Sequence, residues 1–276
     1  MLFESVALFE AHLIAAEKSA VTVEKYVRDV KGFVAFAGER ALSCELTGAY
    51  KAHLLSAGYA ARSVNSMLAS VHSFFDFLGR PDCKVKTVKL QKEIYCPAER
   101  ELTKAEYARL VRTAEARGDE RLALILQTLC GAGLRVSELE FITAEAVKRG
   151  FAVVSCKGKT RKVFLVPKLQ KRLMKFIKGT GVSSGAIFRS KTGKTLNRTT
   201  VWREMKSLCR AANVYPTKVF PHNLRHLFAR VFYQMEKDIA LLADILGHSS
   251  INTTRIYIIS TGEEHRKRME KMKLIL

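Results

Sequence analysis

The chain has 276 residues, of which 48% are hydrophobic, and its formal net charge is +21. This length suits one large domain or two ordinary ones, and the hydrophobic content excludes a basic disordered tail. No stretch approaches the roughly 18 consecutive apolar residues that a membrane span needs, and the N-terminus lacks the basic region of a signal peptide.

The positive charge is concentrated on one part of the chain. Residues 1–95 carry 12 lysines and arginines against 10 acidic residues, whereas residues 148–218 carry 19 against a single acid, Glu204. A cationic surface of this kind attracts a polyanion, with nucleic acid ahead of an anionic membrane. Charge alone leaves open a second interpretation, a solvated surface on an alkaline protein.

The six cysteines are scattered and contain no CxxC pair: Cys44, Cys83, Cys96, Cys130, Cys156 and Cys209. This pattern is typical of reduced, structural cysteines, and we expect a cytoplasmic protein.

Residues 1–80 are expected to form a compact helical domain. In "SAVTVEKYVRDVKGFVAFAGE", apolar residues recur every three or four positions after a cap at Ser19 or Thr22. The segment "ARSVNSMLASVHSFFDFLG" has a second apolar stripe, and "LTGAYKAHLLSAG" between them predicts a shorter helix.

Residues 81–100 are predicted to be an extended linker, because prolines and lysines interrupt any periodic pattern there. Helix resumes in a second domain, residues 101–276. Thr103 and Glu106 have the spacing of a capping box, and "ERLALILQTLCGAG" predicts a buried helix that ends at glycines.

Residues 151–167, "FAVVSCKGKTRKVFLVP", predict a β-hairpin with a cationic tip. Two β-branched or aromatic runs flank a Lys/Gly/Thr turn, and Pro167 closes the second run. The remaining chain returns to helices up to a charged tail, residues 262–276, whose apolar end needs burial.

Several residues suit chemistry at a phosphodiester. The guanidinium fork of arginine matches a pair of nonbridging phosphate oxygens, and imidazoles add further donors without a metal. Arg135 follows a glycine-broken helix, with Glu138 on the same helical face to hold it. The further candidates are His222 and Arg225 in "HNLRH", His248 in "LGHSS", Tyr257 in "TTRIY", and Lys157 at the hairpin tip.

Taken together, "GLRVSEL", "CKGKTRKVFLVP", "HNLRHLFA" and "LGHSSINTTRIY" resemble, in order and spacing, the signature of the tyrosine recombinases, the phage-integrase and Xer-like group. His248 follows Arg225 by 23 residues, and Tyr257 follows His248 by nine. The N-terminal segments "TVEKYVRDVKGF" and "RSVNSMLASVHSFFDFL" resemble the core-binding domain of the same family, so the resemblance spans most of the chain.

The resemblance implies a role for each candidate. Tyr257 would attack the scissile phosphate and form a 3′-phosphotyrosyl link, while Lys157 would protonate the departing 5′-oxygen. Four residues would hold and neutralise the phosphate: Arg135, His222, Arg225 and His248. No metal, ATP or other cofactor is implied. Contacts with the DNA are expected from Arg62, Lys159, Arg161 and Lys162.

The resemblance also implies an architecture and partners. The fold would be mainly α: a helical, SAM-like core-binding domain and a mixed, mostly helical catalytic domain with a small antiparallel sheet, forming a C-shaped clamp. The partner would be double-stranded DNA carrying a specific recombination site. Residues 262–276 would dock into a neighbouring protomer, giving a tetramer on two duplexes, although packing within one chain is an alternative. The chain begins almost at the core-binding helices, which favours a simple-site recombinase, for dimer resolution or for mobile-element integration and excision.

Alternatives remain open for individual residues and for the whole chain. His222, His226 and His248 could form a zinc site, but a guanidinium between the ligands would repel the ion. Lys159 and Lys162 compete with Lys157 for the acid role. His226 is expected to face elsewhere, as support. Local propensity predicts a strand around Tyr257, whereas the resemblance implies a short helix. The rival functions are a type IB topoisomerase and a catalytically silent DNA-binding regulator.

Overall fold

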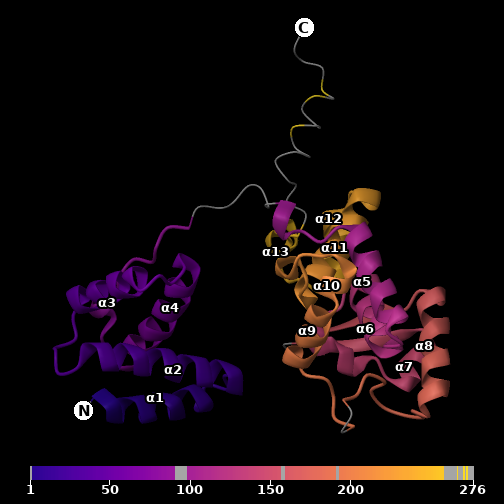
Figure 1. Cartoon of the computed structure of the whole chain (residues 1–276). Coiled ribbons are helices and arrows are strands. Elements are labelled where there is room, and N and C mark those ends of the chain that lie inside the picture. The colour runs from indigo at the N-terminus through magenta and orange to yellow at the C-terminus, as the bar shows by residue number, and fades with distance from the viewer. Residues whose placement is uncertain are drawn as a thin grey trace. The chain divides into compact units, whose positions relative to one another are not determined.

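A computed structural model describes residues 2–90, 98–156, 159–190 and 193–257, together with 266, 270 and 272. The chain divides into two compact units, Met1–Lys92 and Glu93–Leu276, which are called here the first and the second unit. Each unit has its own apolar core. Figure 1 labels the helices that make up each unit. No helix among the described residues is long and apolar enough to span a membrane.

The first unit is helical, as the apolar periodicity predicts. It contains α1 (Leu2–Ala15), α2 (Ala20–Ala37), α3 (Cys44–Ser56), α4 (Ala61–Phe77) and the 3₁₀ helix η1 (Pro81–Cys83). The side chains of Ser19 and Ser43 cap α2 and α3 by accepting backbone hydrogen bonds, which satisfies amides that a helix start leaves without partners. The apolar stripes of α2 and α4 face each other in the core.

Residues beyond 80 continue to pack on the first unit. Cys83 is fully buried in its core, and Val85 and Val88 pack against it. The Asn65 side chain donates to the Val88 carbonyl at 2.9 Å and accepts from the Val88 amide at 2.8 Å. The chain therefore leaves this unit later than the expected boundary at residue 80. Residues 91–97 of the expected linker lie outside the described residues.

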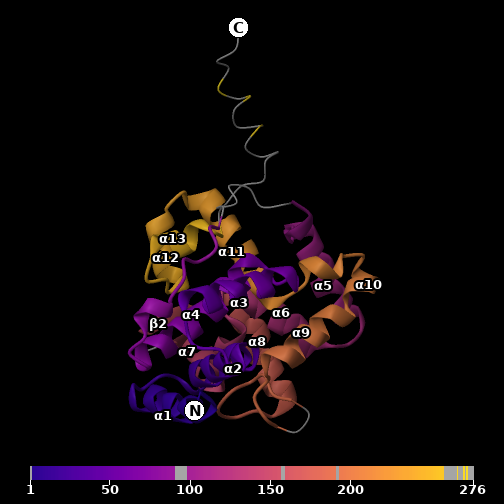
Figure 2. The same cartoon turned by 90° about the vertical axis from the view of Figure 1, so that its left-hand side faces the viewer.

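The second unit is a helical assembly with one hairpin. Its helices are η2 (Ala98–Arg100), α5 (Lys104–Ala116), α6 (Glu120–Gly131), η3 (Val136–Phe141), α7 (Ala144–Arg149), α8 (Pro167–Thr180), α9 (Arg198–Ser207), α10 (Cys209–Ala212), η4 (Pro216–Lys218), α11 (Pro221–Glu236), α12 (Ile239–Leu246) and α13 (Ile251–Arg255). The capping box of Thr103 and Glu106 is present at the start of α5, and α6 is buried along most of its length, as predicted. Figure 2 shows α11, α12 and α13 close together in this unit, as Figure 1 does.

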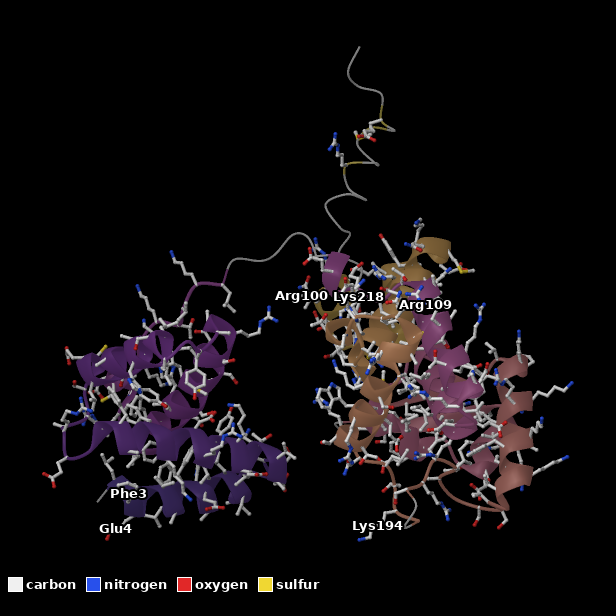
Figure 3. All side chains as sticks on the ribbon, viewed as in Figure 1. Phe3, Glu4, Arg100, Arg109, Lys194 and Lys218 are labelled. Atoms are coloured by element: carbon white, nitrogen blue, oxygen red, sulfur yellow. The ribbon has the colours of Figure 1, made fainter. Side chains whose placement is uncertain are left out.

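Long side chains connect segments of the second unit that are far apart in the sequence. Arg109 on α5 donates to the backbone carbonyls of Ala212 and Asn213, at 2.9 and 3.0 Å. Lys218 forms an ion pair with Glu106 at 2.9 Å. Figure 3, which labels Arg109 and Lys218, shows both on the same side of the unit. These contacts hold the start of α11 against α5.

The predicted hairpin is confirmed. Strands β1 (Phe151–Cys156) and β2 (Lys159–Phe164) are antiparallel, and their register runs from Phe151 opposite Phe164 to Cys156 opposite Lys159. Side chains alternate between the two faces, so Ala152, Val154 and Val163 are buried against the core. Pro167 then begins α8 at a position where a missing amide proton costs nothing.

Candidate active site

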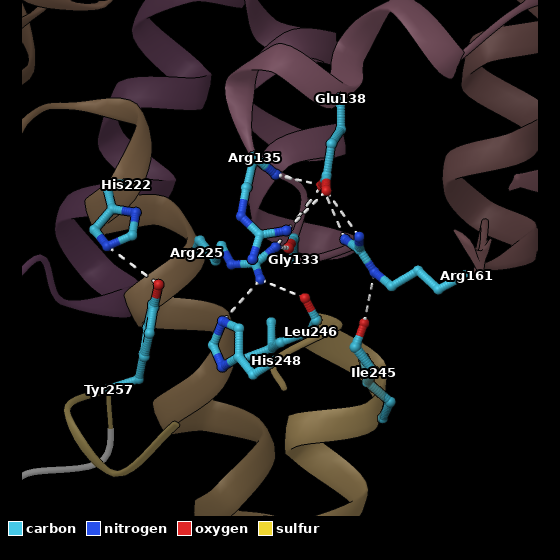
Figure 4. Close-up of polar contacts among 10 residues, drawn as sticks. All are labelled: Gly133, Arg135, Glu138, Arg161, His222, Arg225, Ile245, Leu246, His248 and Tyr257. Atoms are coloured by element: carbon cyan, nitrogen blue, oxygen red, sulfur yellow. Dashed lines mark hydrogen bonds and ion pairs between the residues drawn. The ribbon is translucent and has the colours of Figure 1, made fainter. Parts of the chain in front are cut away.

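The break after α6 positions the first arginine of the site. Gly133 has φ of +60°, a conformation that favours glycine, and it turns the chain from α6 into η3. Arg135 stands at the start of η3, and Glu138 lies one turn later. The Arg135 backbone amide donates to Oε2 of Glu138 at 2.8 Å, and its Nη1 donates to Oε1 at 2.9 Å. The predicted pair of Arg135 and Glu138 is therefore formed (Figure 4).

Arg225 lies on α11 and is completely buried. Its Nη1 donates to the Gly133 carbonyl and its Nη2 to the Leu246 carbonyl, both at 2.6 Å. Burial, followed by repulsion from Arg135, lowers the pKa of Arg225 to about 10, so its guanidinium remains charged at neutral pH. Its Nε has no acceptor among the described residues.

His248 accepts a hydrogen bond from Arg225. The Nη2 of Arg225 lies 3.1 Å from Nε2 of His248, and a guanidinium can only donate, so Nε2 carries no proton. The proton is therefore on Nδ1, which lies 2.9 Å from the buried hydroxyl of Thr254. Burial and the charges of Arg225 and Arg135 lower the pKa of His248 to about 4, consistent with a neutral ring.

Tyr257 follows α13 in a turn, in which its amide donates to the Thr254 carbonyl at 2.9 Å. The short helix that the resemblance implied is therefore present, and residues 251–257, where the described part of this segment ends, form no strand. Only 6% of Tyr257 is exposed. Its hydroxyl lies 3.2 Å from Nε2 of His222. Desolvation and the neighbouring Arg225 and Arg135 lower the pKa of His222, although the outer side of this residue is exposed.

The expectation that His226 faces elsewhere is wrong. On α11 it follows His222 by four residues, and this spacing puts both rings on one face of the helix. The His226 ring stacks on the Tyr257 ring with 4.2 Å between centroids, and its centroid lies 4.8 Å from that of His222. Burial, with smaller contributions from His222 and Arg225, lowers the pKa of His226 to about 4.

Glu138 is a carboxylate surrounded by arginines. Arg161 on β2 donates to Oε1 at 2.7 Å and to Oε2 at 2.9 Å, and Nη1 of Arg225 lies 3.8 Å from Oε2. Burial by itself would raise the pKa of Glu138, but the bonds from Arg161 and Arg135 outweigh it and lower the pKa to about 2. Three guanidinium groups therefore share one carboxylate, and the site keeps an excess of positive charge.

The other predicted residues lie on the exposed face of the hairpin, in the first unit, or outside the described residues. Lys157 is outside them, and so is the side chain of Lys159. Lys162 is exposed, and its Nζ lies 5.3 Å from the centroid of the Phe151 ring. Arg62 is exposed on α4 of the first unit. Among the described residues, no group of three or more His, Cys, Asp or Glu side chains could hold a metal ion.

Comparison with known proteins relates both units of the chain to one family. Residues 100–264 match the phage integrase family, and residues 6–81 match the phage integrase N-terminal SAM-like domain. Tyrosine recombinase XerA of Thermococcus kodakarensis is 32% identical over 99% of this chain and 96% of its own length. Tyrosine recombinase XerD of Pseudomonas aeruginosa is 32% identical over 86% of this chain and 85% of its own length.

Solved structures show the same fold. A lambda integrase tetramer bound to a Holliday junction matches with a TM-score of 0.74 and 18% identity, over 93% of this chain and 76% of the integrase. A XerA recombinase crystal structure matches over the full length of both chains, with a TM-score of 0.56 and 22% identity.

Proposed function

Because the chain belongs to the phage integrase family and is a site-specific DNA recombinase that cleaves and rejoins DNA, we propose that Tyr257 is its nucleophile and that the surrounding cluster binds the scissile phosphate. The observation that carries this proposal is the buried guanidinium of Arg225. It donates to two neutral carbonyls and a neutral imidazole, and the nearby carboxylate of Glu138, 3.8 Å away, is shared with two other arginines, so the charge of Arg225 is incompletely compensated. A phosphate supplies the missing anion.

The chemistry follows from the positions of these groups. The Tyr257 oxygen forms a bond to phosphorus as the bond between phosphorus and the 5′-oxygen breaks. The phenol proton passes to Nε2 of His222, 3.2 Å away, which the low pKa of this ring keeps ready to accept it. Arg135 and Arg225 neutralise the charge that develops on the nonbridging oxygens. The family resemblance assigns protonation of the leaving 5′-oxygen to Lys157, with Lys159 and Lys162 as the competing donors.

Rejoining reverses these steps. A free 5′-hydroxyl attacks the phosphotyrosine, the bond to Tyr257 breaks, and His222 returns the proton to the phenolate. Because the energy of the phosphodiester is retained in the covalent link, the reaction requires no ATP. Attack by a hydroxyl from a second duplex exchanges strands.

The assembly is proposed on the family relationship. The two units would clamp a duplex, Arg62, Lys159 and Lys162 would contact its backbone, and four protomers would synapse two duplexes. The lambda integrase tetramer on a Holliday junction supports this arrangement. Residues 262–276 would dock on a neighbouring protomer; most of them lie outside the described residues.

The nucleophile is tested by trapping covalent adducts. Wild type, Tyr257→Phe and the control Tyr233→Phe are incubated with genomic fragments, the adducts are isolated, and the attached DNA ends are sequenced. We expect adducts at one sequence for wild type and for the control, and none for Tyr257→Phe, which should still bind DNA. Adducts in Tyr257→Phe would place the nucleophile on another tyrosine, and adducts at unrelated sequences would indicate a topoisomerase.

A further inference from the structure

We propose that Arg161 is a positioning residue that fixes the β1–β2 hairpin, and with it the proton donor for the 5′-oxygen, against the phosphate-binding arginines. The inference rests on the function proposed above and adds a residue that acts through others. The sequence suggested that Arg161 contacts the DNA backbone, but its guanidinium bonds Glu138 and the Ile245 carbonyl within the second unit (Figure 4).

The first evidence is the two-pronged bond to Glu138. The nitrogens Nη1 and Nη2 of Arg161 donate to the two carboxylate oxygens at 2.7 and 2.9 Å, and the side chain of Glu138 is only 1% exposed. Glu138 also holds both the amide and the guanidinium of Arg135. Arg161 and Arg135, a proposed phosphate ligand, are therefore bonded to the same carboxylate.

The second evidence is a close approach to the turn that precedes His248. The Nε of Arg161 donates to the Ile245 carbonyl at 3.0 Å. Gly247 has φ of +65°, and a Cβ added there would lie 2.9 Å from Cδ of Arg161. The stem of Arg161 thus passes over a position where only glycine fits. One side chain connects β2, η3 and the turn after α12.

The strand alternation explains why Arg161 does this and its neighbour does not. Arg161 shares a face of β2 with Val163, which is buried, whereas Lys162 points to the exposed face. Only 13% of the Arg161 side chain is exposed. The planar fork of arginine fits both carboxylate oxygens at once, which the single ammonium of lysine cannot do.

This connection has a consequence for the reaction because Lys157 and Lys159 lie on the same hairpin. A general acid must come within hydrogen-bond reach of the leaving oxygen, and an error of about 1 Å can cost about 100-fold in rate. Loss of the Arg161 bonds would leave the hairpin free to shift relative to Arg135. The defect should therefore be one of proton donation.

The test compares two substrates in single-turnover cleavage. In one, the scissile 5′-oxygen is replaced by sulfur, which leaves as a thiolate and needs no proton. We expect Arg161→Gln to cleave the ordinary duplex about 100-fold more slowly than wild type, and the sulfur-containing duplex within about threefold of it. The rate of Arg161→Lys on the ordinary duplex should lie between those of wild type and Arg161→Gln, because lysine keeps the charge but cannot bond both carboxylate oxygens at once.

Three controls separate this role from a loss of fold or of the proposed function. Arg172→Gln removes another ion-paired arginine of the second unit, which bonds Glu115 and Gln127, and should cleave both duplexes normally. Arg135→Ala should be slow on both duplexes. Tyr257→Phe should form no adduct on either, and adducts from it would refute the proposed function rather than this inference.

Two outcomes would overturn the inference. An equal loss on both duplexes in Arg161→Gln, with an unchanged melting temperature, would show that Arg161 acts only on phosphate binding. Normal cleavage of the ordinary duplex would show that the hairpin needs no such anchor. If Arg161→Gln melts early, the same comparison is made with Arg161→Lys, where rescue by sulfur still supports proton-donor positioning and equal loss still contradicts it.

Discussion

At the scale of single residues, the site depends on charged side chains that are buried. Arg225 is fully buried, and Glu138 lies near it with three arginines as neighbours. Such a group of charges is costly to bury unless it is hydrogen-bonded throughout, and excess positive charge is stable only when an anion arrives. Burial, and after it the same excess charge, lowers the pKa values of His222 and His248, so both rings are neutral at neutral pH before DNA binds.

The lowered histidine pKa values predict how stability depends on pH. An unfolded histidine has a pKa near 6.5, whereas those of His226 and His248 are about 4 in the folded protein. The unfolded state therefore binds more protons between these two pH values. The stability that the two neutral histidines contribute is fully present above pH 6.5 and is lost as the pH falls toward 4. Each of these two histidines can contribute about 2 kcal/mol, so we expect urea denaturation of the free protein to show a free energy of unfolding lower by roughly 2–4 kcal/mol at pH 5 than at pH 7.5.

The variant His226→Phe tests one of these two contributions. Phenylalanine can keep the ring stack on Tyr257 but cannot take up a proton. The difference in free energy of unfolding between pH 5 and pH 7.5 should therefore shrink in this variant. An unchanged difference would mean that His226 does not contribute to the pH dependence.

At the scale of elements, the site is built where helices end. Arg135 follows the end of α6, His248 follows α12, and Tyr257 follows α13. Arg225, His222 and His226 instead project from the first two turns of α11, and Glu138 projects from η3. Chain ends of this kind bring side chains from separate segments to one place, which a single continuous helix cannot do.

Gly133 shows how tightly these ends are packed. A Cβ at this position would lie 2.6 Å from Cδ1 of Phe228 on α11, in addition to the strain of a positive φ. Gly118 has the same strain, with φ of +71°, but nothing within 4 Å of an added Cβ. We expect Gly118→Ala to lower the free energy of unfolding by about 1 kcal/mol, and Gly133→Ala by about 2–4 kcal/mol, measured in urea.

The difference in stability between the two variants separates the cost of the contact with Phe228 from the cost of backbone strain, because only Gly133 has a side chain close to the added Cβ. Gly133→Ala should also slow DNA cleavage, because the Gly133 carbonyl accepts from Arg225. Equal losses of stability in the two variants would show that Phe228 moves aside without cost and that packing between α6 and α11 is looser than the structure indicates.

At the scale of the whole molecule, charge is divided unequally along the chain. Nearly all of the excess belongs to residues 148–218, within the second unit. Phosphate contacts release counterions from DNA, so affinity depends on salt in proportion to the number of contacts. The second unit should therefore supply most of the salt-dependent part of the binding energy.

Titrations of binding against salt concentration measure this directly. For six to ten phosphate contacts, affinity should fall by roughly 10³–10⁵ between 50 and 200 mM salt. Lys162→Gln removes one exposed cation with little packing, so the slope of log affinity against log salt should decrease by about 0.9, equally for specific and unrelated duplexes. A slope that does not change would exclude Lys162 from the DNA contacts, and an unchanged melting temperature would confirm that the variant is folded.

Much of the architecture was predictable from the sequence. Apolar periodicity predicts the helices of the first unit, and the capping box of Thr103 and Glu106 and the alternation of residues 151–167 predict α5 and the hairpin. The family resemblance is confirmed, and the contact between Arg135 and Glu138 follows from their separation of three residues. Apart from the family resemblance, which spans the chain, these features are local, because each depends on residues that are close together in the sequence.

What only the tertiary structure decided are the contacts across long separations. It brings Arg161 to Glu138 over 23 residues and to Ile245 over 84, and it stacks His226 on Tyr257. The sequence alone determined which residue types are present and which face of a helix or strand each occupies. It could not determine which faces meet, because that depends on how buried surfaces from distant segments fit together and compensate one another's charges.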